Sequence, residues 1–257
     1  MGLSEVLGGL RGGVAFLTRL PVPTENRDWD RFRAFPAAFP LVGYLVGAVV
    51  SVPFLVGGLA SAAVPEPTVA FGYLLAVVLC VGIPHLDGIA DLGDAAAAHG
   101  RDATRRALKD TETGVGAIVA VVVVLAGLAA AAIELAAVPP LVAVGVVTAA
   151  EVGAKLGMSA VACLGTASHD GIGASFTRGA TPALLFGPAL AALPAAVIVA
   201  PFPVGVAPVV AGPLVAVVLV RWTAEPLGGV NGDVFGATNE LGRVFGLHAG
   251  VIAWTLS

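Results

Sequence analysis

Three aspartates lie close together in a polar stretch between two long apolar runs. The stretch reads HLDGIADLGD, from His85 to Asp94, and its acids are Asp87, Asp91 and Asp94. Their i, i+4, i+7 spacing places the three carboxylates on one face of a helix. Carboxylates crowded near a membrane repel each other and are poorly solvated, and a divalent cation relieves both costs. Since Mg²⁺ is usually held by one or two carboxylates together with substrate phosphates, the stretch predicts a magnesium site for a phosphate-bearing substrate.

Two further residues of this stretch are candidates for a direct part in the reaction. Gly88 has no side chain, so a substrate can approach the backbone closely there. His85 stands two residues before the first aspartate and can serve as a base or as a phosphate contact. Asp87 or Asp91 is the alternative proton acceptor. A competing interpretation is a solvated loop whose acids are incidental and cap the start of a helix.

Basic residues follow the aspartates in the sequence GRDATRRALKDTETG, where Arg105 and Lys109 are one helical turn apart. Arginine binds phosphate through a two-pronged guanidinium group, so Arg105 is predicted to bind substrate. Lys109 is predicted to be catalytic and to offset charge on the leaving phosphate as a point charge. The alternative is that these residues only anchor the cytoplasmic side of a membrane protein.

A second polar, glycine-rich stretch, GGVNGDVFGATNEL, lies near the end of the chain. Asp233 is a further candidate metal ligand, or else a contact for the acceptor sugar, and Gly232 allows a phosphate close to the backbone. Asn239 and Glu240 are predicted to bind substrate, because Glu240 lies seven residues after Asp233 on the same helical face. Arg19, in the polar segment RLPVP, is predicted to face the same side and to bind substrate. One site built from two loops is therefore expected.

The rest of the chain must place these loops, and its composition is that of a membrane protein. Hydrophobic residues make up 58% of the 257 residues, charged residues make up 12%, and the mean hydropathy is +0.96. An average soluble domain carries about 25% charged residues. The net charge of −4 is too small to indicate a nucleic-acid partner. With about 20 apolar residues needed to cross a bilayer, candidate spans lie at residues 35–60, 68–84, 115–138, 140–164, 182–200, 206–221 and 244–256, the last of them short.

The distribution of positive charge predicts how these spans are oriented. Every arginine falls in one of four hydrophilic segments, as does Lys109, and Lys155 lies within a span. Positive residues mark the cytoplasmic side, so the N-terminus and the hydrophilic loops are expected to be cytoplasmic. The four segments are residues 1–33, 85–114, 165–181 and 221–243.

The predicted fold is all-α, a polytopic integral membrane helix bundle with about six or seven transmembrane helices. It is expected to form one domain over residues 1–257 in the cell membrane, with its active site on the cytoplasmic face. Its parts are a cytoplasmic or interfacial N-terminal segment (1–34), an acidic-motif loop (85–114) and a second active-site loop (223–243). Homo-oligomerisation is left open by the sequence.

Five motifs occur in the order in which one enzyme family carries them: FLTRLPVP, FPLVGYLVG, HLDGIADLGD, LKDTETGVGA and GGVNGDVFGATNEL. On these motifs the chain resembles the cobalamin synthase family, the adenosylcobinamide-GDP ribazoletransferases. The resemblance implies an integral membrane enzyme of cobalamin biosynthesis that requires Mg²⁺. It implies transfer of the phospho-cobinamide group of adenosylcobinamide-GDP to α-ribazole, or to its 5′-phosphate, with release of GMP.

Three other functions are weighed against this resemblance. A membrane phosphotransferase that uses CDP-linked substrates would carry an Ala-Arg pair shortly after its first Asp-Gly, where this chain has Asp91. A prenyltransferase would show two aspartate-rich motifs, and the second loop here has one aspartate. A transporter predicts charged groups at mid-membrane depth. Glu151 and Lys155 are the main such groups, and their i, i+4 spacing predicts that they pair with each other.

Overall fold

The protein is a bundle of helices with its two ends chemically distinct. The structure, a computed structural model, describes residues 2–60, 64–98, 100, 103–104 and 112–257. Across these ranges every regular element is a helix, and the β-bridge between Ala167 and Val230 is isolated. The all-α prediction is therefore confirmed. The helices are α1 (Leu3–Leu17), α2 (Asp28–Arg33), α3 (Ala38–Val50), α4 (Val52–Leu59), α5 (Glu66–Val81), α6 (Pro84–Ala97), α8 (Val115–Ala136), α9 (Pro140–Leu164), α10 (Ile172–Thr177), the 3₁₀ helix η1 (Pro182–Leu185), α11 (Phe186–Val197), α12 (Pro203–Ala224) and α13 (Gly232–Thr255).

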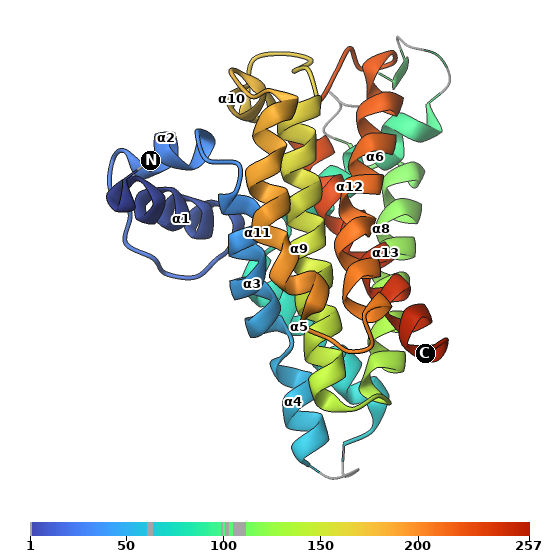
Figure 1. Ribbon diagram of the computed structural model, residues 1–257. Coiled ribbons are helices and arrows are strands. Elements are labelled where there is room, and N and C mark those ends of the chain that lie inside the picture. Colours follow the sequence, from blue (N-terminus) through green and yellow to red (C-terminus); the bar gives the residue numbers. More distant parts are fainter. Residues whose placement is uncertain (1, 61–63, 99, 101–102, 105–111) are drawn as a thin grey trace.

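Helix α9 forms the centre of the bundle and is buried along most of its length. It packs chiefly on α3, α12 and α13, and Figure 1 shows it running through the middle of the molecule. Small residues make this close packing possible: a Cβ atom at Gly212 of α12 would collide with the carbonyl group of Gly153. Glycine and alanine at such contacts let backbones approach, which is how membrane helices associate without a hydrophobic driving force between them.

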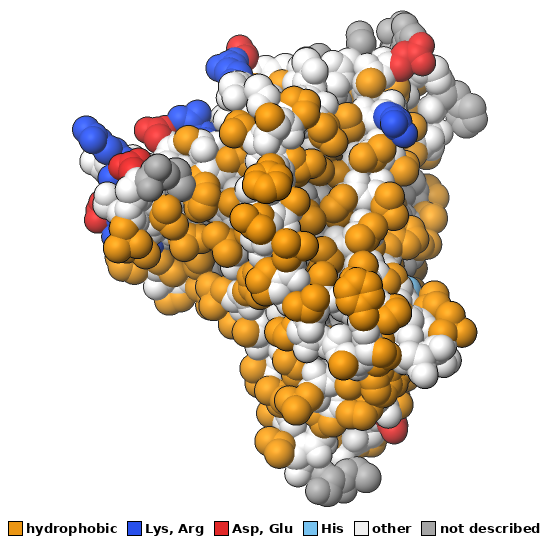
Figure 2. All heavy atoms as spheres, viewed as in Figure 1, with side chains coloured by type: hydrophobic (Ala, Val, Ile, Leu, Met, Phe, Trp, Pro, Cys, Tyr) orange, Lys and Arg blue, Asp and Glu red, His pale blue; other side chains and the backbone are white. Residues whose placement is uncertain are grey.

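Four helical stretches are long and apolar enough to cross a membrane: Ala38–Leu59, α8, α9 and α12. Helices α5 and α6 meet the same criterion together, although they are bent by 98° where they join, which raises the number to five. Hydrophobic side chains cover the middle and lower parts of the face seen in Figure 2, and most charged side chains gather at its upper end and over α1 and α2. These features place the chain among membrane proteins.

The expected count of six or seven spans is not confirmed. The segment predicted at 182–200 forms η1 and α11, which together are apolar but shorter than a bilayer crossing. The segment predicted at 244–256 is the second half of α13, a 24-residue helix whose first half carries buried charged side chains. The proline pair at 139–140 does separate two spans as expected, since α8 ends at Ala136 and α9 begins at Pro140.

The N-terminal helices α1 and α2 lie to one side of the bundle (Figure 1). The carboxylate of Asp28 is buried between them and accepts hydrogen bonds from the Glu25 amide at 2.9 Å and from Arg11 and Arg31 at 3.1 Å each. The Glu25 amide lowers the pKa of Asp28, burial opposes this effect, and the two arginines lower the pKa further. An ionised acid therefore ties α2 to α1.

Candidate active site at the polar end of the bundle

The acidic stretch begins at a sharp turn between α5 and α6. Gly82 ends α5 with a φ of 82°, a left-handed conformation that favours glycine. Pro84 opens α6, where its fixed φ suits the first helical position. Because the two helices are bent by 98°, α6 leaves the direction of α5 and carries its aspartates toward the start of α13. The polar end of the bundle is defined here by α6, α10 and the first turn of α13.

Glycines hold α6 and α13 in direct backbone contact. A Cβ atom at Gly88 would lie 2.6 Å from the carbonyl oxygen of Asp233, and one at Gly236 would lie 3.1 Å from the Cα atom of His85. Gly88 is buried in this contact. Gly88 therefore permits a close approach of α13 to α6. The sequence analysis had instead predicted that substrate approaches the backbone at Gly88.

This packing brings the acids of the two predicted loops together. The carboxylate of Asp91 is close enough to Asp233, Asp87 and Asp94 to be repelled by each of them. Burial raises the pKa of Asp233, a hydrogen bond from Asn231 opposes this rise, and Asp87 adds to it. Asp87 is exposed, whereas Asp91 and Asp233 are half-buried. The structure thus joins α6 and α13 into one acidic site, as the two-loop prediction required.

The acidic site fits a magnesium ion through its donor chemistry. In the part of the chain that the structure describes, no three His, Cys, Asp or Glu side chains are arranged so that they could hold a metal ion. Mg²⁺ needs fewer than that from a protein, because water and substrate phosphates complete its octahedron around one or two carboxylates. Asp87 and Asp91 on α6, with Asp233 facing them, supply carboxylates of this kind.

Asp94 lies differently from the other two aspartates of α6. Its two carboxylate oxygens accept hydrogen bonds from the backbone amides of Gly114 and Ala117, at 2.8 Å each. These amides belong to the start of α8, where the first N–H groups have no partner within the helix. Asp94 thus caps α8 and joins it to α6, which is the helix-capping alternative that the sequence left open, while its role as a metal ligand stays a prediction.

Asn231 is a site residue that sequence reasoning missed. Its side-chain oxygen accepts a hydrogen bond from the Val234 amide at 3.2 Å and so caps α13. Its Nδ2 atom donates to the carboxylate of Asp233 at 2.6 Å. The available signal was the asparagine itself, placed directly before Gly232, where α13 begins.

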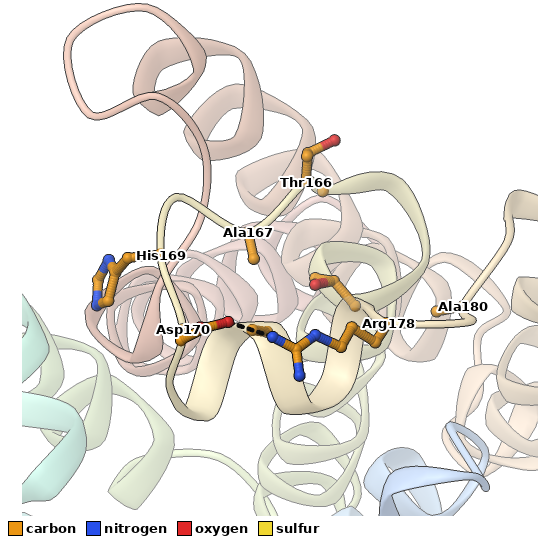
Figure 3. A pocket seen from close by; sticks show the side chains of 9 residues that line it. Thr166, Ala167, His169, Asp170, Arg178 and Ala180 are labelled. Carbon is orange, nitrogen blue, oxygen red and sulfur yellow. Dashed lines mark hydrogen bonds and ion pairs between the residues drawn. The ribbon is translucent and has the colours of Figure 1, made fainter.

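The segment 165–180 lies against the start of α13. Val230 donates a backbone hydrogen bond to Thr166 at 2.8 Å and accepts one from Ser168 at 2.9 Å. Figure 3 shows the resulting pocket, in which Asp170 and Arg178 point toward each other and His169 points away from them. The pocket encloses about 630 Å³ and is lined by Gly165, Thr166, Ala167, His169, Asp170, Ala174, Thr177, Arg178 and Ala180.

Arg19 lies beside the turn that starts α6. Its backbone amide donates to the Cys80 carbonyl at 2.7 Å, and its side-chain stem packs on Gly82. The residue is exposed, and no ion pair among the described residues involves it. Arg19 therefore carries its positive charge beside the turn between α5 and α6, and its role in substrate binding stays a prediction. The other two basic candidates, Arg105 and Lys109, lie outside the described residues.

A buried network of charged side chains supports the acidic site from within the bundle. Lys155 donates to Glu151 at 2.6 Å, which confirms their predicted pairing. Arg243 donates to Glu151 and to Glu240, at 2.5 Å each. The Asn239 amide contacts Lys155 at 3.0 Å, and all five side chains are buried.

This burial changes the interpretation of two predicted substrate contacts. Asn239 and Glu240 are engaged inside the network, which favours a positioning role over direct contact with substrate. Arg243 was missed by sequence reasoning, although an arginine three residues after Glu240 in a largely apolar helix is a signal for a buried pair. Gly232 starts α13 beside Asp233, and its role as a substrate contact stays a prediction.

Comparison with known proteins assigns this chain to a family. The sequence model of cobalamin-5-phosphate synthase matches residues 9–251, nearly the whole chain. The chain belongs to the cobalamin-5-phosphate synthase family. Membership makes it a transferase of cobalamin biosynthesis, in agreement with the resemblance seen in its motifs.

Curated members of the cobalamin-5-phosphate synthase family align with the chain over most of its length. A relative from Halorubrum lacusprofundi is 45% identical over 97% of this chain and 99% of its own length. One from Haloquadratum walsbyi is 41% identical over 98% of this chain and 100% of its own. One from Halobacterium salinarum is 56% identical over 75% of this chain and 98% of its own. All three are named adenosylcobinamide-GDP ribazoletransferase. No solved structure matches the chain.

Proposed function

We propose that the enzyme transfers the phospho-cobinamide group of adenosylcobinamide-GDP to α-ribazole, or to its 5′-phosphate, and releases GMP. The names of the relatives support this substrate pair. The observation that carries the proposal is the joining of acids from α6 and α13 at the polar end, with Arg19 at the turn that precedes α6. Acids that repel one another suit a metal ion and a substrate that brings phosphates to it.

The reaction is a phosphoryl transfer in which one P–O bond forms as another breaks. A ribose hydroxyl of α-ribazole attacks the phosphorus on the cobinamide side, and the bond from that phosphorus to the oxygen of GMP breaks. Such a transfer depends on positioning and charge neutralisation more than on covalent chemistry. The hydroxyl proton passes to a group on α6, for which the candidates are the carboxylates of Asp87 and Asp91 and the ring of His85.

Residues of this chain would hold Mg²⁺ and the departing nucleotide. Asp91 and Asp233 would bind the ion as its two protein carboxylates, with Asp87 beside them and Asp94 capping α8. When bound, Mg²⁺ supplies charge neutralisation on the pyrophosphate oxygens. Arg19, Arg105 and Lys109 are proposed to bind the phosphates that the carboxylates would otherwise repel.

We place the enzyme in the cell membrane with its polar end toward the cytoplasm. Apart from Lys155, the positive residues lie in the hydrophilic segments of the sequence, and among them Arg243 is buried. Positive residues in short connections favour the cytoplasmic side. This orientation would expose the acidic site to soluble nucleotide substrates.

Asp91→Asn in the purified full-length enzyme tests the proposed reaction. GMP release from adenosylcobinamide-GDP and α-ribazole should fall by about 100-fold or more, because the central carboxylate of the acidic site loses its charge. Asp30→Asn is the matched control, since Asp30 is an exposed acid on α2 paired with Arg33, and it should leave the rate unchanged. A rate close to the wild type in Asp91→Asn, or no GMP from the wild type, would overturn the proposal.

A further inference from the structure

The contacts of Asn239 determine which way round its amide lies. Its side chain meets Lys155 Nζ at 3.0 Å, Glu240 Oε1 at 3.1 Å and His85 Nδ1 at 3.0 Å. Arg243 donates to the other oxygen of Glu240, so both oxygens of this carboxylate act as acceptors. An ammonium group has only donors and a carboxylate only acceptors. Both neighbours therefore require the same orientation, with Oδ1 toward Lys155 and Nδ2 toward Glu240 and His85.

The reverse orientation would create two repulsions at once. The amide NH₂ would face the ammonium of Lys155, and Oδ1 would face the carboxylate of Glu240. Asn239 and Lys155 are fully buried and Glu240 almost so, and water cannot screen such contacts. The orientation of the Asn239 amide thus follows from its two partners, the donor Lys155 and the acceptor Glu240.

This amide orientation selects one tautomer of His85. Because Nδ2 of Asn239 donates, the Nδ1 atom of His85 must accept and carries no proton in the neutral ring. The proton of the neutral ring then lies on Nε2. That atom takes part in no hydrogen bond between described residues and is not among the buried atoms without a partner. Nε2–H thus has no acceptor among the described residues, and the His85 side chain keeps 12% of its surface exposed at the start of α6.

We propose that His85 acts as a neutral hydrogen-bond donor to the substrate diphosphate through Nε2–H, and that Asn239 is the positioning residue that sets this tautomer. The inference rests on the proposed function for its ligand. Lys155 and Glu240 act through Asn239, because they fix its amide. A ring that donates from Nε2 and is blocked at Nδ1 does not take the proton of the attacking hydroxyl. That proton goes instead to a carboxylate of α6, Asp87 or Asp91.

Nitrogen spectroscopy of the full-length enzyme, without substrate, tests the tautomer directly. The chain has four histidines, so ¹⁵N-histidine labelling in lipid nanodiscs gives few signals, and His85→Gln identifies the one from His85. His248 is an internal reference, because its Nε2 atom lies 3.0 Å from the Gly127 carbonyl oxygen and must carry a proton to donate to it. His85 should match His248, with Nε2 protonated and Nδ1 bare. A proton on Nδ1 of His85 would overturn the proposal.

Asn239→Asp probes the cause of the tautomer. A carboxylate at this position accepts where the amide donated, so the proton of His85 should move to Nδ1. An unmoved proton in folded Asn239→Asp would contradict the positioning role. Where this variant fails to fold, the wild-type spectrum still decides the tautomer.

Two substitutions at His85 test its catalytic role as a donor. The amide nitrogen of glutamine reaches the place of Nε2, whereas that of asparagine reaches only the place of Nδ1. His85→Gln should therefore keep GMP release within about tenfold of the wild type, and His85→Asn should lose about 100-fold, as when one donor to a transition-state oxygen is removed. Equal, large losses in both variants would indicate a base and overturn the proposal. Absence of GMP from the wild type would refute the proposed function alone, since the spectrum reads the tautomer without any reaction.

Discussion

Lys155→Met is expected to destabilise the bundle strongly, because it leaves a buried negative charge without compensation. The buried network holds two acids, Glu151 and Glu240, and two bases, Lys155 and Arg243, so it is neutral when all are ionised. Removing one partner of a buried pair costs about 3–5 kcal/mol. Loss of the lysine's hydrogen bond to Asn239 adds about 1 kcal/mol. The free energy of unfolding should therefore fall by about 4–6 kcal/mol.

A double variant separates charge balance from the loss of contacts. Glu151→Gln combined with Lys155→Met removes one charge of each sign and leaves the Arg243–Glu240 pair. Both variants lose the contact of Lys155 with Asn239, so the difference between them reports the buried charge. The double variant should be more stable than Lys155→Met by about 2 kcal/mol or more in reversible unfolding by SDS in mixed micelles. A double variant as unstable as Lys155→Met, or less stable, would refute the reasoning.

Three other predictions concern single residues. The Glu25 amide and two arginines hold the pKa of Asp28 below its usual range although burial opposes them, so this acid adds stability above about pH 4 that is lost as pH falls through its folded pKa. Asp28→Asn should flatten the acid side of the thermal-stability profile, and an unchanged profile would count against the effect. Asp94→Ala should cost about 1 kcal/mol and speed hydrogen exchange at residues 114–117, because α8 loses its cap; amides that stay protected there would contradict this. Gly88→Ala places a Cβ atom 2.6 Å from a carbonyl oxygen of α13 and should lower GMP release by about tenfold or more. Gly187→Ala, whose nearest neighbour would be 3.9 Å away, should not lower it, and equal rates in the two variants would show that the contact is unimportant.

The positions of the acids on α6 could be predicted because they follow from the spacing of neighbouring residues along one helix. Asp87 and Asp91 share a helical face by spacing alone, and the Glu151–Lys155 pair follows from the same periodicity. The union of α6 with the start of α13 was predicted from polarity, since both stretches interrupt apolar runs. The two helices meet through glycines that let their backbones touch, and this packing cannot be inferred from either stretch of sequence alone.

The tertiary partners of polar residues were the part that sequence reasoning could not supply. Asn239 and Glu240 were predicted to meet substrate because they are polar and lie near Asp233. Asn239 instead contacts Lys155 of α9, and Glu240 contacts Arg243 one turn later in α13. Only the fold reveals that these polar side chains are bound to partners inside the bundle. The expected count of six or seven spans was not confirmed for a related reason. The charged side chains of α13 are buried inside the bundle, so this long helix is not uniformly apolar.

Metal binding by variants of both helices tests the central claim that α6 and α13 form one site. Mn²⁺ in place of Mg²⁺ is detected by electron paramagnetic resonance, so its dissociation constant can be measured on the full-length enzyme with GMP present. Asp91→Asn on α6 and Asp233→Asn on α13 should each weaken Mn²⁺ binding by about tenfold or more. The combined variant should lose less than the product of the two, because both acids serve one ion. Unchanged binding in Asp233→Asn beside weakened binding in Asp91→Asn would contradict a shared site.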